Sequence, residues 1–232
     1  MSTPYYCRKV AFDYFVAQMP RLHETTGLLR AAVAIALHGL PNLDPEQTEV
    51  EIRHLVERVT RRVRSGSEQA RLAHLHDELF EVAGFRGNSD DYYNPLNSYL
   101  PLVLETRRGL PITLTLLYKC VAEPLGLKVH GINAPGHFLA RVDTAEGSLY
   151  IDSFAGGRVL SRDEVYERVA QAMGQPVAPS EEFLSVAGHR PWLSRILNNL
   201  QATFAQREEM HPLAAMQELQ ATLYAARLPD ER

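Results

Sequence analysis

The chain contains little cysteine. Cys7 and Cys120 are the two cysteines among its 232 residues. Two cysteines are too few for the disulfide framework of a small secreted domain, and they fit a reducing compartment. The first nine residues, Met1-Ser2-Thr3-Pro4-Tyr5-Tyr6-Cys7-Arg8-Lys9, include no apolar stretch of the kind that marks a secretory signal. We therefore expect a cytoplasmic protein.

Long apolar runs and a strong excess of charge are also missing. No segment is apolar for long enough to span a bilayer. The formal net charge of −4 provides neither the basic surface of a nucleic-acid-binding protein nor a polybasic membrane patch. We therefore expect no nucleic acid and no membrane as partner. Hydrophobic residues make up 45% of the chain, which is ordinary for a globular protein with a sizeable core.

Motifs for common cofactors and metals are absent from the sequence. The pair Gly156-Gly157 is not followed by Lys and Ser or Thr, so it predicts a turn and not a phosphate cradle. His130, His137 and Asp152 could bind a metal only if the fold brought them together, and neither His-x-x-x-His nor Cys-x-x-Cys spacing supports this. We expect no cofactor and no metal.

Helical periodicity dominates the first part of the chain. Apolar residues recur at helical spacing from His23 to Leu40, from Pro45 to Arg64 and from Glu68 to Val82. Asp44 before Pro45 is typical of a helix N-terminus. Residues 1–20 could form a short helix or an extended segment. A further short helix is predicted from Ser98 to Thr106.

The middle of the chain changes from helix to strand. Residues 112–125 are apolar on nearly all helical faces, which predicts a central buried helix. The period then changes to two, which predicts strands at 127–132, 138–142 and 148–152. Ser161 and Glu164 are spaced as a capping box at the start of a helix over 163–173.

A linker and two helices complete the chain. Residues 174–180 are rich in proline, and amphipathic helices are predicted over 194–207 and 212–226. This pair resembles a single tetratricopeptide-type repeat, which must dock on the preceding part because it cannot bury its own apolar face. Trp192 is the expected anchor. The predicted parts are an N-terminal helical part (1–88), a core (89–175) and a linker with the helical pair (176–232).

Three candidate site segments follow one another in a particular order. A helix start marked by Gly109 and Pro111 is followed by His137 beside a strand and by Asp152 at the end of the next strand. Papain-like folds present a nucleophile, a base and an orienting carboxylate in this order. The expected position of the nucleophile, however, contains no cysteine.

Four motifs carry a resemblance to a known family. They are Asp91-Tyr92-Tyr93-Asn94-Pro95-Leu96-Asn97-Ser98-Tyr99-Leu100, Arg108-Gly109-Leu110-Pro111-Ile112-Thr113-Leu114, Pro135-Gly136-His137-Phe138-Leu139 and Ile151-Asp152-Ser153-Phe154-Ala155-Gly156-Gly157. Together they resemble the SirB1 family of the transglutaminase-like superfamily, over roughly residues 25–225. The resemblance implies an α+β fold with a papain-like core, in which a buried central helix packs on a small antiparallel sheet, with N-terminal helices and a C-terminal helical hairpin.

The resemblance also implies roles for individual residues. His137 and Asp152 match the superfamily's His and Asp, whereas Pro111 falls where active members have the nucleophilic Cys. Pro111 offers no nucleophilic atom, and the hydroxyl of Thr113, two residues further on, is a far weaker nucleophile than a thiolate. Cys120 lies about two helical turns beyond Pro111 and is expected in the core.

Two functions remain open at this stage. The first is a protein-binding or regulatory module without catalysis, whose partner is an unidentified protein or peptide. The alternative is an acyl-transferase or an amide or ester hydrolase that uses His137 and Asp152, with Thr113 or a water as nucleophile. The loop over residues 89–97 either packs tightly or lines a cleft, and Asn97, Tyr93 and Ser98 are the candidate substrate-binding residues. The oligomeric state is left open.

Overall fold

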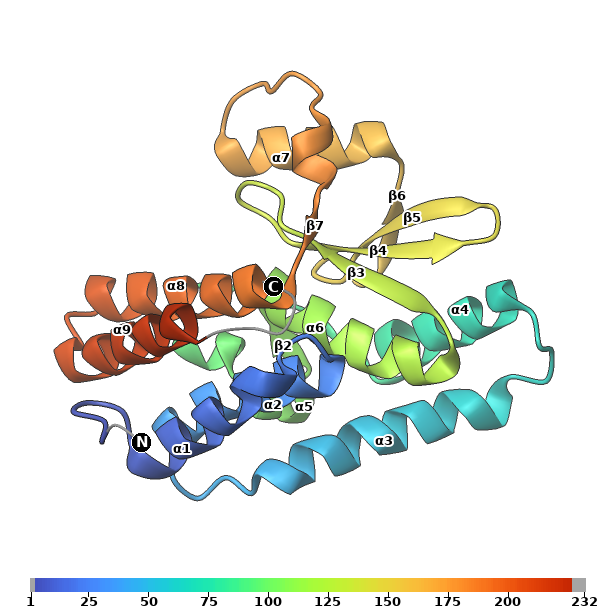
Figure 1. Cartoon of the computed structure of the whole chain (residues 1–232). Helices are drawn as coiled ribbons and strands as arrows, with labels where there is room; N and C mark the ends of the chain where they lie inside the picture. The colour runs from blue at the N-terminus through green and yellow to red at the C-terminus, as the bar shows by residue number, and fades with distance from the viewer. Residues whose placement is uncertain (1–2, 227–232) are drawn as a thin grey trace.

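The computed structural model describes residues 3–226 and confirms an α+β fold with terminal helices around a small antiparallel sheet (Figure 1). The helices are α1 (Lys9–Gln18), α2 (Thr25–Gly39), α3 (Pro45–Arg62), α4 (Glu68–His76), α5 (Leu100–Thr106), α6 (Pro111–Ala122), α7 (Arg162–Met173), α8 (His189–Gln206) and α9 (Met210–Ala225). The strands are β1 (Arg86–Gly87), β2 (Arg108–Gly109), β3 (Lys128–Ile132), β4 (Leu139–Thr144), β5 (Gly147–Asp152), β6 (Arg158–Leu160) and β7 (Val186–Ala187).

The sheet has the strand order β6-β5-β4-β3-β7, and every neighbouring pair is antiparallel. The central strands form a meander because short turns connect β3 to β4 and β4 to β5. Ala140 pairs with Ile151, so the residues that lead into β4 lie beside Asp152 at the end of β5. This register decides where the candidate site forms.

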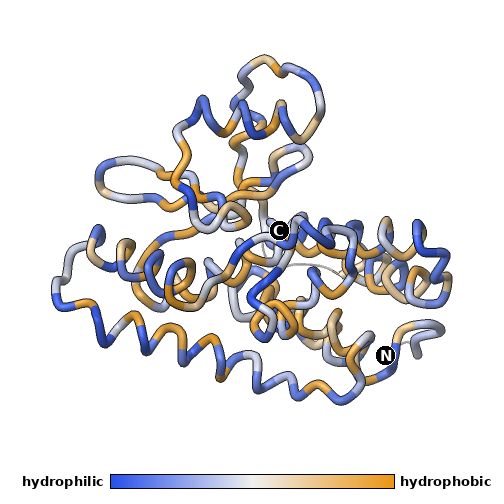
Figure 2. Tube along the Cα trace, turned by 180° about the vertical axis from the view of Figure 1, so that it is seen from behind, coloured by the Kyte–Doolittle hydropathy of each residue, from blue (hydrophilic) through white to orange (hydrophobic). Residues whose placement is uncertain are grey.

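Helix α6 is the centre of the main core, as its apolar sequence predicts. All twelve of its residues are buried, including Lys119. Helix α6 contacts β3 and β4 on one side and α2, α3, α5 and α8 on others. Figure 2 shows the resulting contrast with α3, where hydrophilic and hydrophobic residues alternate along the helix at the periphery of the molecule. A helix without a polar face must be covered on all sides.

The opposite face of the sheet has its own small core. Residues from β3–β6 pack there against α7 and the 181–184 turn; the buried residues are Ile132, Ala134, Leu139, Tyr150, Leu160, Val165, Val169 and Leu184. The predicted capping box is present at the start of α7, where Ser161 and Glu164 bond reciprocally to each other's backbone. Helix α7 thereby covers the face of the sheet that α6 leaves open (Figure 1).

The N-terminal helices resolve one open choice and differ from the prediction at one place. Residues 9–18 form α1, which resolves the choice between a helix and an extended segment. The predicted helix over 68–82 is α-helical only to His76 and continues as a π-helical segment to Val82. No helix within residues 3–226 is long and apolar enough to cross a lipid bilayer.

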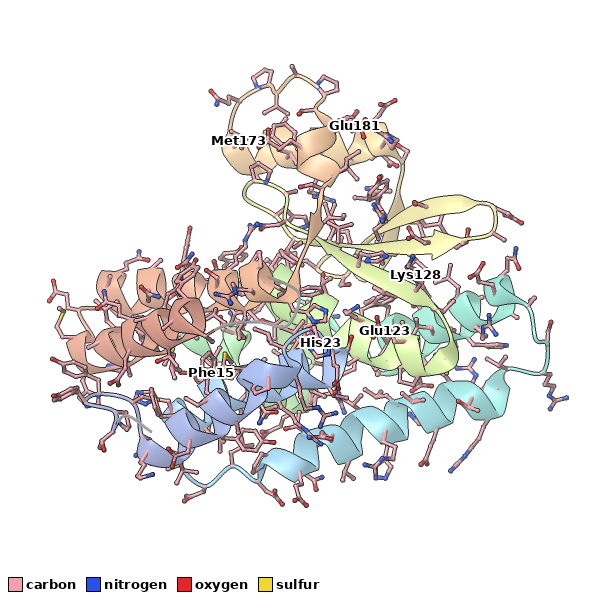
Figure 3. The ribbon with its side chains drawn as sticks, in the orientation of Figure 1. Phe15, His23, Glu123, Lys128, Met173 and Glu181 are labelled. Carbon is pink, nitrogen blue, oxygen red and sulfur yellow. The ribbon has the colours of Figure 1, made fainter. Side chains whose placement is uncertain are left out.

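A buried lysine joins the N-terminal helices to the sheet. Lys119 of α6 pairs with Glu123 and donates a 2.6 Å hydrogen bond to the carbonyl oxygen of Val129 on β3. Glu123 also accepts a 2.5 Å hydrogen bond from the hydroxyl of Thr25 at the start of α2. Figure 3 shows Glu123 below Lys128 of β3 and next to the segment that carries His23. The charge of Lys119 is therefore compensated where three elements meet.

Trp192 anchors α8 to the rest of the molecule. Its fully buried ring lies 4.7 Å from the ring of Phe138, and its Nε1 donates to the carbonyl oxygen of Ile112 on α6 at 3.4 Å. Helices α8 and α9 pack against each other, and the main core includes residues from both. The three-part division of the chain stays a prediction, and its outer ends, residues 1–2 and 227–232, lie outside the described residues.

We expect Gly131→Ala to destabilise the fold. A Cβ at residue 131 would lie 2.4 Å from the ring of Trp192 and 2.8 Å from the ring of Phe138, and neither buried ring has space to move. Such overpacking costs about 1–3 kcal/mol in the free energy of unfolding. Urea denaturation measures this cost. Gly66→Ala is the control, because nothing lies within 4 Å of its added Cβ. Equal urea midpoints for both variants would contradict the packing described here.

Candidate functional site

The turn between β3 and β4 carries His137 to the end of β5. Gly136 has a φ of +67°, a conformation that glycine adopts at little cost. A Cβ at this position would also meet Ala172 of α7 at 2.6 Å, so the turn lies close against that helix. The Nε2 atom of His137 lies 3.0 Å from Oδ1 of Asp152. The structure therefore brings the predicted His and Asp together.

The Asp152 carboxylate is buried and surrounded by compensating groups. Only 1% of the residue is exposed. Its Oδ1 accepts 3.1 Å hydrogen bonds from the backbone N–H groups of Phe154 and Ala155. Its Oδ2 lies 3.2 Å from Nε of Arg168 on α7. Arg168 was not predicted from the sequence, because only the tertiary packing of α7 brings it to the end of β5.

These contacts determine the ionisation of Asp152. Burial alone raises the pKa of a carboxyl group, because it penalises the charged form. Here the His137 imidazole, the Ala155 N–H and the Arg168 guanidinium more than offset burial, and the pKa of Asp152 lies below its ordinary value. The carboxylate is therefore charged at neutral pH and can orient His137.

A pocket of about 220 Å³ opens beside His137. Its lining comes from the loop before α5, the start of α6, the turn before β4 and helix α8: Tyr92, Pro111, Ile112, Gly136, His137, Phe138, Arg195 and Asn199. Within residues 3–226, Nδ1 of His137 has no hydrogen-bond partner. The arrangement is an oriented imidazole beside a helix N-terminus, which can bind a polar group or accept a proton.

Two pocket residues on α8 were not predicted from the sequence. Arg195 and Asn199 are four residues apart, so they share one face of the helix. That spacing can be read from the sequence and could have marked them as a pair. Nothing in the sequence, however, indicates that this face of α8 meets the start of α6.

Sequence comparison places the fold among known proteins. The profile described as the transglutaminase-like superfamily matches residues 46–198, which include the helix start at Pro111 and both His137 and Asp152. The chain belongs to the transglutaminase-like superfamily.

Individual relatives support the same assignment. A UPF0162 protein of Xylella fastidiosa (strain 9a5c) is 38% identical over 186 residues, which cover 78% of this chain and 66% of that protein. The UPF0162 protein PA3419 of Pseudomonas aeruginosa is 30% identical over 93% of this chain and 76% of its own. F-box only protein 21 of Mus musculus is 34% identical over 66% of this chain and 25% of its own.

The chain spans about two thirds of the length of the Xylella fastidiosa relatives, at 66% and 67%. No solved structure matches the chain.

The loop residues predicted to bind substrate do not line the pocket of this superfamily member. Asn97 is buried, and its side-chain amide donates to the carbonyl oxygens of Asp91 and Tyr92 at 2.7 and 3.2 Å. Its Oδ1 accepts from the Asn88 amide at 2.9 Å. Asn97 thus fixes the loop from within. Ser98 is buried as well, and neither residue is among those that line the pocket.

Two tyrosines of this loop extend to the surface. Tyr93 is 66% exposed and does not line the pocket, whereas its neighbour Tyr92 does. Their rings make an edge-to-face contact with centroids 5.3 Å apart. Tyr92, which was not among the residues predicted to bind substrate, is thus the loop residue that lines the pocket.

Thr113 and the cysteines lie away from the pocket. Thr113 is 1% exposed, its hydroxyl has no hydrogen-bond partner within residues 3–226, and it is not among the lining residues. Cys120 lies in the core, as expected, and burial raises the pKa of its thiol to about 12. Burial also raises the pKa of the Cys7 thiol to about 12. Both thiols are therefore protonated at neutral pH.

The three residues considered as metal ligands in the sequence, His130, His137 and Asp152, do not form a cluster in the described part of the chain. His130 lies 3.1 Å from Asp143 on β4, away from the pair formed by His137 and Asp152. No group of three or more His, Cys, Asp or Glu residues within 3–226 could hold a metal ion.

We expect Asp152→Asn to destabilise the protein in a pH-dependent manner. Because the folded-state pKa of Asp152 is depressed, its charge stabilises the fold above the unfolded-state pKa of about 3.9. This contribution is lost as the pH falls through the folded-state pKa. The variant should lose about 2 kcal/mol in the free energy of unfolding at pH 7, and less as the pH is lowered below 4.

Urea denaturation at several pH values measures this difference. Asp90→Asn is the control, because Asp90 is exposed in a loop. A deficit for Asp152→Asn that stayed constant down to pH 3 would show that the carboxylate charge does not stabilise the fold.

Proposed function

We propose that this chain is a SirB1-type member of the transglutaminase-like superfamily that does not catalyse acyl transfer, and that its pocket binds a peptide or protein partner in a regulatory role. One observation carries the proposal. The pocket beside His137 is lined by neither a cysteine nor a serine nor a threonine, and Pro111 begins the helix at the place proposed for the nucleophile. An acyl-enzyme requires a nucleophilic atom at this place.

The cysteines of the chain do not replace the missing nucleophile. The thiolate is the reactive form, and a reactive thiol lies in a partly exposed, electropositive environment. Cys7 and Cys120 are buried, with thiol pKa values raised to about 12. As free thiols they are compatible with the cytoplasm, which we retain as the proposed compartment.

Features around the pocket support binding. Tyr92 and Tyr93 provide aromatic surface at its edge, and aromatic side chains are enriched at binding interfaces. Helix α8, the first helix of the proposed tetratricopeptide-like pair, contributes Arg195 and Asn199. In mouse, the similar segment makes up a quarter of F-box only protein 21, so this kind of domain also occurs as one part of a longer protein.

A second candidate function is hydrolysis of an amide or ester by an activated water. The observation that favours it is the pairing of His137 Nε2 with Asp152 in a residue that lines the pocket, while Nδ1 has no hydrogen-bond partner in the described residues. A histidine in this state can act as a general base. Thr113 is a weaker candidate than water, because its hydroxyl is buried outside the pocket lining.

We expect the wild-type chain to show no turnover of ester or amide substrates above the buffer rate. Pro111→Cys, in contrast, should gain a thiol that iodoacetamide alkylates rapidly at neutral pH. A helix N-terminus and an adjacent histidine both favour the thiolate, which raises the alkylation rate by about tenfold or more over an ordinary thiol. Hydrolysis of p-nitrophenyl acetate and mass spectrometry after alkylation provide the two measurements.

The matched control is the double variant with Pro111→Cys and His137→Ala, which keeps the helix N-terminus and removes the imidazole. Its thiol should react more slowly than that of Pro111→Cys. Wild-type turnover that disappears in His137→Ala would refute the non-catalytic proposal and support water-based hydrolysis.

Peptide binding should depend on the exposed tyrosine beside the pocket. Peptides selected from a random library against the wild-type chain should bind Tyr93→Ser about tenfold more weakly, because loss of an aromatic contact at an interface costs about 1–2 kcal/mol. Fluorescence anisotropy measures the affinities. Tyr5→Ser is the control, since Tyr5 is 91% exposed on the N-terminal segment. Equal losses in both variants would place the binding surface elsewhere.

A further inference from the structure

Arg195 has an unusual electrostatic environment beside the pocket. Its Nη1 donates to the side-chain oxygen of Asn133 and, at 2.8 Å, to the carbonyl oxygen of Ala134. The guanidinium carbon lies 5.6 Å from the centroid of the Phe138 ring. These partners carry no negative charge. Within residues 3–226, Arg195 has no carboxylate within ion-pair distance.

Arg195 is half-buried, and partial loss of water makes its charge costlier than on an open surface. Desolvation lowers the pKa of the Arg195 guanidinium from its ordinary value. Its Nε and Nη2 groups make no hydrogen bonds to the described residues, although a guanidinium has five donor hydrogens. Nη1 and Phe138 hold the group in place, while the remaining donors have no protein acceptor.

The start of α6 adds positive potential at the same pocket. Helix α6 has twelve residues, and its N-cap residue Leu110 provides no side-chain hydrogen bond. Pro111 has no N–H, and Ile112, as the second helical residue, has no acceptor one turn back within the helix. Both residues line the pocket. A helix N-terminus with uncapped N–H groups favours an anion.

His137 adds a further polar group to the pocket. The residue is 8% exposed and lines the pocket, and its Nδ1 has no hydrogen-bond partner in the described part of the chain. The other ring nitrogen, Nε2, faces Asp152, so Nδ1 is the atom of this ring that stays available to a ligand or to solvent. No acidic residue is among those that line the pocket.

We propose that this pocket binds the carboxylate of a peptide, seated between the guanidinium of Arg195 and the N-terminus of α6, with the Asn199 amide and His137 as further polar contacts. The planar fork of an arginine matches a carboxylate, which can accept two hydrogen bonds from it. A volume of about 220 Å³ admits a carboxylate with its adjoining atoms and not a whole folded segment. The proposal rests on the proposed function, because it names the ligand chemistry of a pocket that binds without turnover.

A carboxylate fits these observations better than a phosphate. A phosphate dianion calls for more compensating charge, and Arg195 is the one arginine or lysine among the lining residues of this pocket. The peptide carboxylate could come from a chain terminus or from an acidic side chain, and both sources present the same group to the arginine.

The test is an NMR titration of the full ¹⁵N-labelled chain with small probes. Acetyl-Gly-Gly with a free carboxylate represents a chain terminus, and acetyl-Glu-amide represents an acidic side chain. Acetyl-Gly-Gly-amide is the neutral control, because it differs from acetyl-Gly-Gly only in lacking the carboxylate. We expect at least one carboxylate probe to shift the backbone signal of Ile112 and the side-chain amide signal of Asn199 in a saturable manner, whereas the neutral probe leaves both unchanged. The probe that binds identifies the source.

Arg195→Met should lower the affinity for the carboxylate probe by at least about tenfold. Arg195→Lys should lower this affinity less, because lysine keeps the charge and loses the planar fork. Arg53→Met is the matched control, since Arg53 is exposed on α3, and it should bind as the wild type does. Unchanged signals outside the pocket establish that each variant is folded.

Three results would overturn the proposal: equal binding of the neutral amide, unchanged binding by Arg195→Met, or tighter binding of inorganic phosphate than of either carboxylate probe. These failures differ from failure of the proposed function, which is detected as His137-dependent turnover. A chain that hydrolyses esters could still bind the carboxylate, and an inert chain could fail to bind it.

Discussion

Complete burial of α6 is the constraint on which the arrangement of the molecule depends. A helix with twelve buried residues cannot present any side to water, so other elements must cover it all round. The sheet covers one side of α6, and the N-terminal helices cover other sides. Helix α8 also packs against α6, where Trp192 donates a hydrogen bond to the carbonyl oxygen of Ile112. The side chains at the start of α6 are buried too, yet Pro111 and Ile112 border a pocket there. The site lies where this cover is incomplete.

The same packing explains why the site draws on distant parts of the chain. The loop before α5, the turn before β4 and helix α8 all meet at the start of α6. The backbone N–H of Leu110 donates to the carbonyl oxygen of Asn97 at 3.1 Å, and this bond ties the loop to that helix start. Asn97 thus contributes to the pocket by holding its wall, although its amide does not enter it.

The structure surrounds two charges near the pocket differently, the buried Asp152 and the half-buried Arg195. Asp152 receives two backbone N–H groups, an imidazole and a guanidinium, so its charge is fully compensated. Arg195 receives only neutral acceptors and an aromatic face. The first arrangement fixes the geometry of the site, and the second leaves a positive charge that a ligand can neutralise. Folding alone explains the contacts of Asp152 but leaves the charge of Arg195 without a counter-ion.

Patterns among neighbouring residues predicted the helices and strands, whereas tertiary packing determined which residues form the candidate site. The apolar surface of α6, the alternating strands and the Ser161–Glu164 cap are properties of neighbouring residues, so the sequence alone was sufficient to predict them. The pairing of His137 with Asp152 followed from the family resemblance. Arg168, Arg195 and Asn199 could not be placed, because their roles depend on how α7 and α8 dock. The π-helical segment after His76 was missed because its apolar spacing is close to that of an α-helix.

The chemistry of the superfamily and the proposed binding have a common electrostatic basis. In acyl transfer, an active site stabilises the negative charge that develops on an oxygen in the transition state, and a helix N-terminus is suited to this. Pro111 offers no nucleophilic atom at this helix start, but the helix dipole does not depend on which residue begins the helix. The Arg195 charge and the polar atoms of His137 and Asn199 lie beside that helix end. The same positive potential is suited to a permanent negative charge, and a carboxylate presents that charge in the ground state.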